Sequence, residues 1–252
     1  MRVLPAGEVL RLWDECQDAS PDGRALALAA AVDGGIGSAE LADRPVGRVT
    51  ALLLRLRTAL AGPEMSAVVT CPDCGQAVEF QAATGPLLAL EDKVVDSPPP
   101  LLHGGHEVTW RSPSYGDLLA VAEQPGAADP DRGAALLLDR CVLRVRHEEG
   151  TAPVTAADLP EAVREALSEA MSTADPLADV LVDLRCPDCG SEFTAGFDAA
   201  AFVWAEVESR ARHLLLDIDA LARSYGWSES DVLALSEPRR AAYLRIVTGE
   251  LP

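Results

Sequence analysis

The chain has 252 residues, enough for one or two domains with a substantial core. Hydrophobic types make up 48% and charged types 24%, which is typical of a globular protein and excludes a largely disordered chain. Acidic residues outnumber basic ones by 40 to 21, and the formal net charge of −19 repels nucleic-acid phosphates and anionic lipid. Composition therefore argues against a nucleic-acid or membrane partner, and no uncharged apolar run is long enough for a transmembrane helix.

Hydrophobic periodicity predicts helices over most of the chain. They are expected at about 8–17, 21–32, 46–60, 115–123, 132–146, 199–225, 229–235 and 238–247, and one more helix is expected to end near residue 172. Five of them have N-terminal capping signals, which are Ser20 before Pro21, Ser114, Thr155 with Asp158, Asp198, and Ser228 with Asp231. Three glycines, Gly34, Gly35 and Gly37, are expected to end the second helix.

Short alternating segments predict strands between these helices. They are expected at 67–70, 77–81, 107–111, 180–184 and 192–197. The segment 86–105 contains three consecutive prolines and two glycines, and it is predicted to be a linker or irregular loop.

Four of the six cysteines lie in two identical pentapeptides, Cys71-Pro-Asp-Cys74-Gly and Cys186-Pro-Asp-Cys189-Gly, each between two predicted strands. This pattern is typical of zinc knuckles, because the turn directs both thiolates to one point and zinc takes four such ligands. We therefore predict one structural Zn²⁺ per chain. Redox-active or disulfide-bonded pairs are the alternative, but a redox motif usually opens a helix. Another metal is a third interpretation.

The knuckles are separated by 111 residues, so the predicted zinc ribbon has a large insertion between its halves. The expected fold is α+β and mainly helical, with a zinc ribbon formed by the two CPDCG hairpins. Three parts are predicted: an N-terminal helical segment (1–66), the split ribbon with its α/β insertion (67–198) and a C-terminal helical segment (199–252). The first 17 residues lack the apolar centre of a signal peptide, so a reducing, cytoplasmic location is expected.

The remaining candidate residues give weaker signals. Cys16 and Cys141 lie among apolar helical residues and are expected to be buried. His103 and His106 could form a second metal pair, but an irregular loop with two unliganded histidines is the preferred interpretation. His147 and His213 lie beside arginines and are expected to be solvated.

The C-terminal segment combines an apolar helical stripe with a local cluster of positive charge. Either it is ordinary core, or it is an arm that docks onto a partner protein. The candidate partner-binding residues are Trp227, Arg239, Arg240, Tyr243 and Arg245.

Several segments together resemble a known family. In chain order they are 24–28, 45–60, 62–64, the first knuckle with 78–80, 110–119, 137–142, the second knuckle, 225–235, 239–240 and 243–244. The sequence resembles the baseplate-hub proteins of T-even-type phages, in the zinc-binding version found beside phage-tail-like contractile injection systems. One departure is Ser112 before Pro113, where the family usually has leucine.

The resemblance implies a non-enzymatic structural or assembly protein of a contractile injection system. Its partners would be baseplate, hub or spike proteins, and it would be incorporated into the particle or act during assembly. The sequence itself contains no common catalytic motif. A zinc-ribbon adaptor for nucleic acid or transcription is the alternative, but such a domain is expected to carry a basic stripe. A metalloenzyme is disfavoured because four cysteines leave no ligand position for water.

Overall fold

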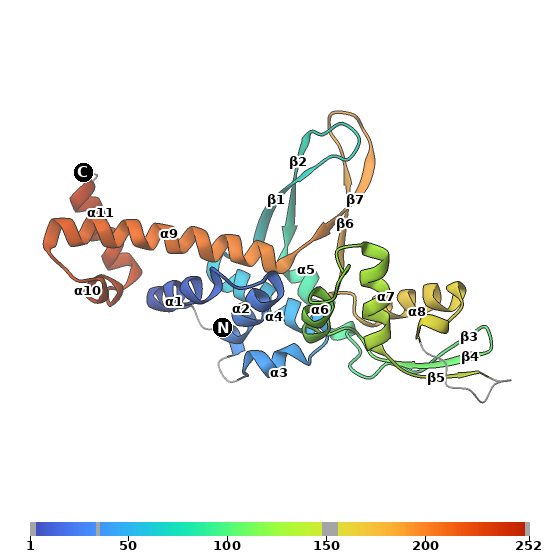
Figure 1. Ribbon diagram of the computed structural model, residues 1–252. Helices are drawn as coiled ribbons and strands as arrows, with labels where there is room; N and C mark the ends of the chain where they lie inside the picture. The colour runs from blue at the N-terminus through green and yellow to red at the C-terminus, as the bar shows by residue number, and fades with distance from the viewer. Residues whose placement is uncertain (1–3, 34–35, 148–155, 250–252) are drawn as a thin grey trace.

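The computed structural model describes residues 4–33, 36–147 and 156–249. Within these ranges it is an α+β protein, mainly helical, with three small antiparallel sheets. Figure 1 shows a central helical body from which two β-hairpins project together, with an α/β lobe at one end and a C-terminal helical lobe at the other.

The helical body is built from the N-terminal helices and the first half of the longest helix. Its helices are α1 (Ala6–Cys16), α2 (Pro21–Asp33), α3 (Ser38–Ala42), α4 (Val46–Ala61) and α9 (Ala199–Tyr225). The fully buried large side chains are mostly leucine, as expected from a chain with few aromatic residues. Helix α9 begins at Asp198, whose carboxylate accepts a hydrogen bond from the N–H of Ala201 at 2.9 Å, as its capping signal predicts. The main core draws on all three of the parts predicted from the sequence.

The projecting pair of hairpins, called the arm below, carries the cysteines. Its strands are β1 (Glu64–Thr70), β2 (Ala77–Ala83), β6 (Val180–Arg185) and β7 (Glu192–Phe197). Both hairpins pair antiparallel, β1 with β2 and β6 with β7. Figure 1 shows the two hairpins side by side, with their turns together at the far end of the arm.

The α/β lobe lies in the segment between the hairpins and has a small core of its own. The elements of this segment are α5 (Thr84–Leu88), η1 (Glu91–Lys93), β3 (Leu101–His103), β4 (His106–Trp110), α6 (Tyr115–Ala122), α7 (Pro130–Cys141), β5 (Val142–His147), η2 (Ala156–Asp158) and α8 (Glu161–Ala174). Of these, α5 and α6 pack on helices of the central body. Strands β3, β4 and β5 form one sheet in that order. Helix α8 contributes Val163 and Leu167 to the small core, which also contains Val108 and Trp110.

A buried carboxylate holds the base of this lobe together. Asp117, which is 2% exposed, completes a capping box with Ser114 at the start of α6. One oxygen of the same carboxylate accepts hydrogen bonds from the guanidinium groups of Arg111 and Arg140, each at a distance of 2.9 Å. Helix α6 is therefore tied to the end of β4 and to α7.

The structure corrects two predictions in this region and adds one helix elsewhere. The helix predicted over 132–146 ends at Cys141, and the next six residues form β5, because alternating apolar and charged side chains suit a strand paired with β4. The segment 86–105 is not a continuous loop, since it contains most of α5, all of η1 and β3. The short helix α3 was not predicted. The capping signal at Thr155 and the turn at Gly34 and Gly35 lie outside the described residues.

The C-terminal lobe folds back on the second half of α9. Helix α10 (Glu229–Leu233) begins with the predicted capping box of Ser228 and Asp231, and α11 (Glu237–Thr248) follows it. Leu221 of α9 and Val232 of α10 are fully buried between these elements. The C-terminal helices therefore pack on their own chain, and Figure 1 shows them at the end of α9 farthest from the arm.

Candidate metal centre

The two CPDCG turns have the same backbone geometry. In the first, the N–H of Cys71 donates to the carbonyl of Gln76 at 2.8 Å, and the N–H of Gly75 donates to the carbonyl of Cys71 at 3.0 Å. In the second, Cys186 and Gly190 make the corresponding bonds with the same two distances. Gly75 and Gly190 have φ of +74° and +77°, a left-handed conformation that favours glycine. The repeated sequence therefore builds a repeated turn.

These turns bring the four sulfurs to one place. The Sγ of Cys71 lies 3.7 Å from that of Cys189, and the Sγ of Cys74 lies 3.6 Å from that of Cys186. All four sulfurs lie within 4.8 Å of one another. A tetrahedral ion with metal–sulfur bonds of about 2.3 Å requires sulfur–sulfur separations of about 3.8 Å. The four cysteines could therefore hold one metal ion.

The site is closed on its inner side. Cys71 and Cys186 are each 1% exposed and pack with Val69, Val78 and Phe193, whereas Cys74 and Cys189 are exposed. Each motif therefore supplies one sulfur from the interior of the arm and one from its surface.

The surroundings shift the pKa values of Cys186 and Cys74 in opposite directions. The backbone N–H groups of Cys189 and Asp188 lower the pKa of Cys186 to about 7, although burial opposes the shift. At Cys74 the N–H of Gln76 acts in the same direction, but partial desolvation and the other three sulfurs raise the pKa to about 12. Four thiolates at these separations repel one another, so a bound cation is needed for all four to ionise together.

A polar contact joins the two turns beside the sulfurs. The hydroxyl of Ser191 donates to the carboxylate of Asp73, which lies 118 positions earlier in the chain. The guanidinium of Arg185 also donates to the carbonyl of Gly190 at 3.3 Å. The first bond connects the two turns through protein atoms alone, whereas the second lies within the second hairpin.

The structure places the two other cysteines away from this site, as the sequence predicts. Cys16 and Cys141 are both fully buried, one in the helical body and the other at the end of α7. Burial raises the pKa of both thiols, that of Cys141 to about 12. Neither thiol has the character of a metal ligand or a nucleophile.

The candidate partner-binding residues gather in the C-terminal lobe. Trp227 stacks on Tyr225 with ring centroids 4.7 Å apart, and it meets Tyr243 edge-on at 4.9 Å. Arg240 is buried and forms an ion pair with Asp217 at 3.2 Å, so its charge is used within the chain. Arg239 and Arg245, by contrast, are exposed on α11.

One pair of residues was missed by the sequence analysis. The structure brings His106 of β4 and His147 of β5 into contact, with ring centroids 4.5 Å apart. From the sequence, His106 is expected in an irregular loop and His147 at a solvated position beside an arginine. The alternating pattern of residues 142–146 is the signal that could have put His147 on a strand.

Within residues 4–33, 36–147 and 156–249, no helix combines the length and apolar character needed to cross a membrane. Comparison with known proteins gives no family model, no curated protein and no solved structure that matches this chain.

Proposed function

We propose that Cys71, Cys74, Cys186 and Cys189 bind one Zn²⁺ and that the two CPDCG hairpins form a split zinc ribbon. The observation that carries the proposal is the convergence of four sulfurs at separations suited to a tetrahedral ion. Four sulfur ligands with the knuckle sequence favour zinc over metals that prefer oxygen.

The proposed role of the ion is structural. Four thiolates fill the tetrahedron, so no position remains for a water or substrate that the metal would activate. Structural zinc sites contribute about 10–16 kcal/mol in apparent binding free energy, which is comparable to the stability of a whole domain. When bound, the ion would cross-link two hairpins that lie far apart in the sequence and would hold the far end of the arm rigid.

We further propose that the chain is a non-enzymatic structural or assembly protein of a contractile injection system baseplate or hub, which acts in the bacterial cytoplasm or within the particle. The support is the resemblance stated above. Two of the resembling segments form defined local structures: 110–119 includes the capping box of α6, and 225–235 forms the corner between α9 and α10.

The proposed docking surface for baseplate, hub or spike proteins is the exposed side of the C-terminal lobe. Arg239 and Arg245 are exposed there in a chain of strongly negative net charge. The guanidinium of Arg239 lies 5.9 Å from the ring centre of Tyr243, so cationic and aromatic groups occur together. Such a surface suits an acidic partner, and its binding would weaken with salt.

The test is capture of purified baseplate, hub and spike proteins of a contractile particle by the full-length chain. Arg239→Glu with Arg245→Glu is expected to abolish capture. The matched control is Arg132→Glu with Arg144→Glu, which makes the same charge change at exposed positions of α7 and β5, outside the C-terminal lobe, and is expected to retain most of the capture. No capture by the wild-type chain, or equal capture by both variants, would contradict the proposed docking surface.

The nucleic-acid alternative finds no support in the arm. Charged residues of the arm strands are mostly acidic, with Glu64, Glu79, Asp183 and Glu192 against Arg185. A surface that binds phosphate backbones is instead expected to be basic.

A further inference from the structure

The tip of the α/β lobe is a tight hairpin flanked by histidines. Gly104 and Gly105 form the two-residue turn between β3 and β4, with φ of +56° and +74°. Both angles are positive, as in a type I′ turn, which glycine adopts without steric cost. The turn makes His103 and His106 register partners, and the next strand pairs His106 with His147. Three histidines are therefore neighbours across the sheet, although the last is 41 positions from the second.

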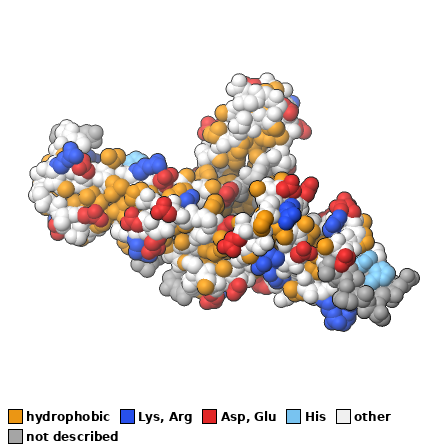
Figure 2. Space-filling model, in the orientation of Figure 1, with side chains coloured by type: hydrophobic (Ala, Val, Ile, Leu, Met, Phe, Trp, Pro, Cys, Tyr) orange, Lys and Arg blue, Asp and Glu red, His pale blue; other side chains and the backbone are white. Residues whose placement is uncertain are grey.

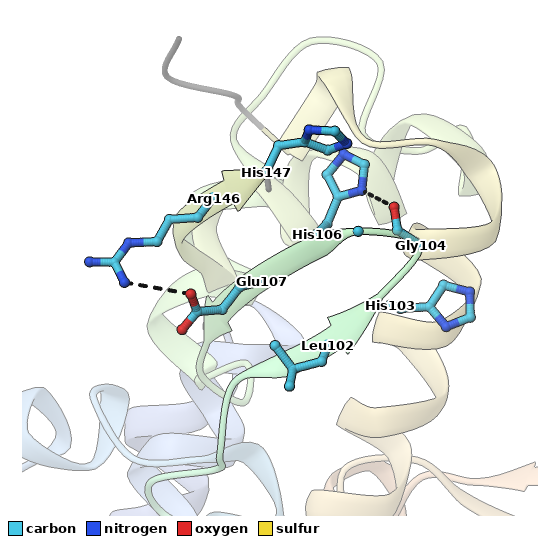
Figure 3. Close-up of a pocket in the computed structure, with 8 residues that line it drawn as sticks. Leu102, His103, Gly104, His106, Glu107, Arg146 and His147 are labelled. Carbon is cyan, nitrogen blue, oxygen red and sulfur yellow. Dashed lines mark hydrogen bonds and ion pairs between the residues drawn. The ribbon is translucent and has the colours of Figure 1, made fainter. Parts of the chain in front are cut away.

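His106 and His147 are the two that meet. Their ring centroids are 4.5 Å apart and the rings are inclined by 68°. Figure 3 shows the two rings on the same side of the sheet and directed toward one another, whereas the ring of His103 points away from them. Figure 2 also shows histidine side chains gathered at this end of the molecule.

The backbone fixes the tautomer of His106. Its Nδ1 lies 2.9 Å from the carbonyl oxygen of Gly104. A carbonyl oxygen only accepts, so Nδ1 carries the hydrogen, and in the neutral ring Nε2 keeps its lone pair. Metal-binding histidines usually have this arrangement, in which the second ring nitrogen donates to a backbone carbonyl.

The surroundings leave room for an ion and its water ligands. The histidines line a hollow of about 510 Å³ at the end of the sheet. Arg146 also lines this hollow, and its guanidinium pairs with Glu107 at 3.5 Å. Arg146 and Glu107 are adjacent in sequence to the two histidines, and successive side chains on a strand point to opposite faces. Figure 3 shows the Arg146 side chain directed away from the imidazole pair.

From this geometry we propose that His106 and His147 form a second metal site, which binds one divalent first-row transition ion such as Zn²⁺. Imidazole is a preferred ligand for zinc, nickel and copper, whereas calcium and magnesium prefer oxygen. Two protein ligands leave the remaining coordination positions to water. The second site thus differs from the closed four-sulfur site in being open to exchange.

The test uses the full-length chain carrying one equivalent of zinc, titrated with a second equivalent while the imidazole nitrogens are followed by NMR. We expect the signals of His106 and His147 to shift and those of His213 to stay in place. His213 lies on α9, a helix that Figure 1 shows well away from this sheet, and it provides the matched control. Addition of Mg²⁺ instead of Zn²⁺ is expected to shift none of them.

Variants then assign the ligands. His106→Gln and His147→Gln should each weaken binding of the second zinc by at least ~10-fold, since even loss of an outer partner costs 10–100-fold. His103→Gln and His213→Gln should leave it unchanged, and circular dichroism checks that each variant is folded. Absence of a second zinc-dependent shift contradicts the site. Equal weakening in the His103 or His213 variant contradicts the assignment of its ligands.

Discussion

One carboxylate oxygen of Asp175 accepts a hydrogen bond from the backbone N–H of Gly47 at 2.9 Å, across 128 positions of the chain. Gly47 lies in the first turn of α4, where the backbone N–H groups have no partner within the helix. Asp175 is 1% exposed and follows α8, so it joins the end of the α/β lobe to the helical body. A Cβ on Gly47 would lie only 1.8 Å from the other carboxylate oxygen, so the contact requires glycine.

Gly47→Ala is therefore expected to destabilise the protein. Alanine normally stabilises a helix by up to about 1 kcal/mol relative to glycine, but here it is forced against a buried carboxylate, and overpacking costs about 1–3 kcal/mol. Chemical denaturation measures the change. The control is Gly85→Ala, at a helical glycine whose Cβ position has nothing within 4 Å. A Gly47→Ala variant as stable as the wild type would contradict the close approach of Gly47 to the carboxylate of Asp175.

Acid should weaken the base of the α/β lobe. Burial alone would raise the pKa of Asp117, but hydrogen bonds from Arg111 and Ser114 outweigh it and hold the pKa well below its usual range. Because the folded-state pKa is the lower one, this contribution is complete above the unfolded-state pKa of about 3.9 and is lost as the pH falls below it.

Asp117→Asn should thus be less stable than the wild type at pH 7, and the difference should shrink as the pH falls below about 4. Thermal unfolding across this pH range measures it. Asp139→Asn, at an exposed position of α7, should show no such pH-dependent difference. A constant gap between Asp117→Asn and the wild type would contradict the assigned role of this carboxylate.

The cysteines should fall into two classes. Cys186→Ser is expected to lose the metal and cooperative unfolding, because the site joins segments 112 positions apart. Cys16→Ala and Cys141→Ala should keep the metal and lose only about 1–3 kcal/mol, as expected for a small buried cavity. Metal analysis with calorimetry separates the classes, and three variants that unfold alike would contradict the division.

Two adjacent arginines of α11, Arg239 and Arg240, should likewise contribute unequally to stability. Arg240 pairs with Asp217 at 3.2 Å and its side chain is 9% exposed, so Arg240→Ala is expected to cost about 1–3 kcal/mol. Arg239→Ala, at an exposed position, should stay within about 0.5 kcal/mol of the wild type. Chemical denaturation gives both values. Equal losses in the two variants would mean that the buried pair does not stabilise the lobe.

Local sequence signals predicted much of this structure. The identical pentapeptides identified the four clustered cysteines, because five consecutive residues determine both the thiol ligands and the turn that presents them. Asp198 marked the start of α9, and Ser114 and the capping box of Ser228 with Asp231 marked two other helix starts. These features depend on neighbours in the sequence and need no knowledge of the tertiary fold.

The features that were not predicted depend on contacts between residues far apart in the sequence. Strand β5 continues a leucine-rich helix without a break, and its pairing with β4 is what selects the extended backbone. The contact between His106 and His147 follows from that pairing, so it could not be predicted without it. The bond between Gly47 and Asp175 likewise depends on how the lobe docks against α4.

The central claim is that four sulfurs bind one structural zinc ion, and metal analysis combined with X-ray absorption tests it most directly. Protein purified without added metal, and exchanged free of weakly bound ions, should contain about one zinc per chain. Its absorption spectrum should show four sulfur ligands at about 2.3 Å. A folded chain that contains no zinc and has disulfides among Cys71, Cys74, Cys186 and Cys189, or a zinc ion with oxygen or nitrogen ligands, would contradict the claim.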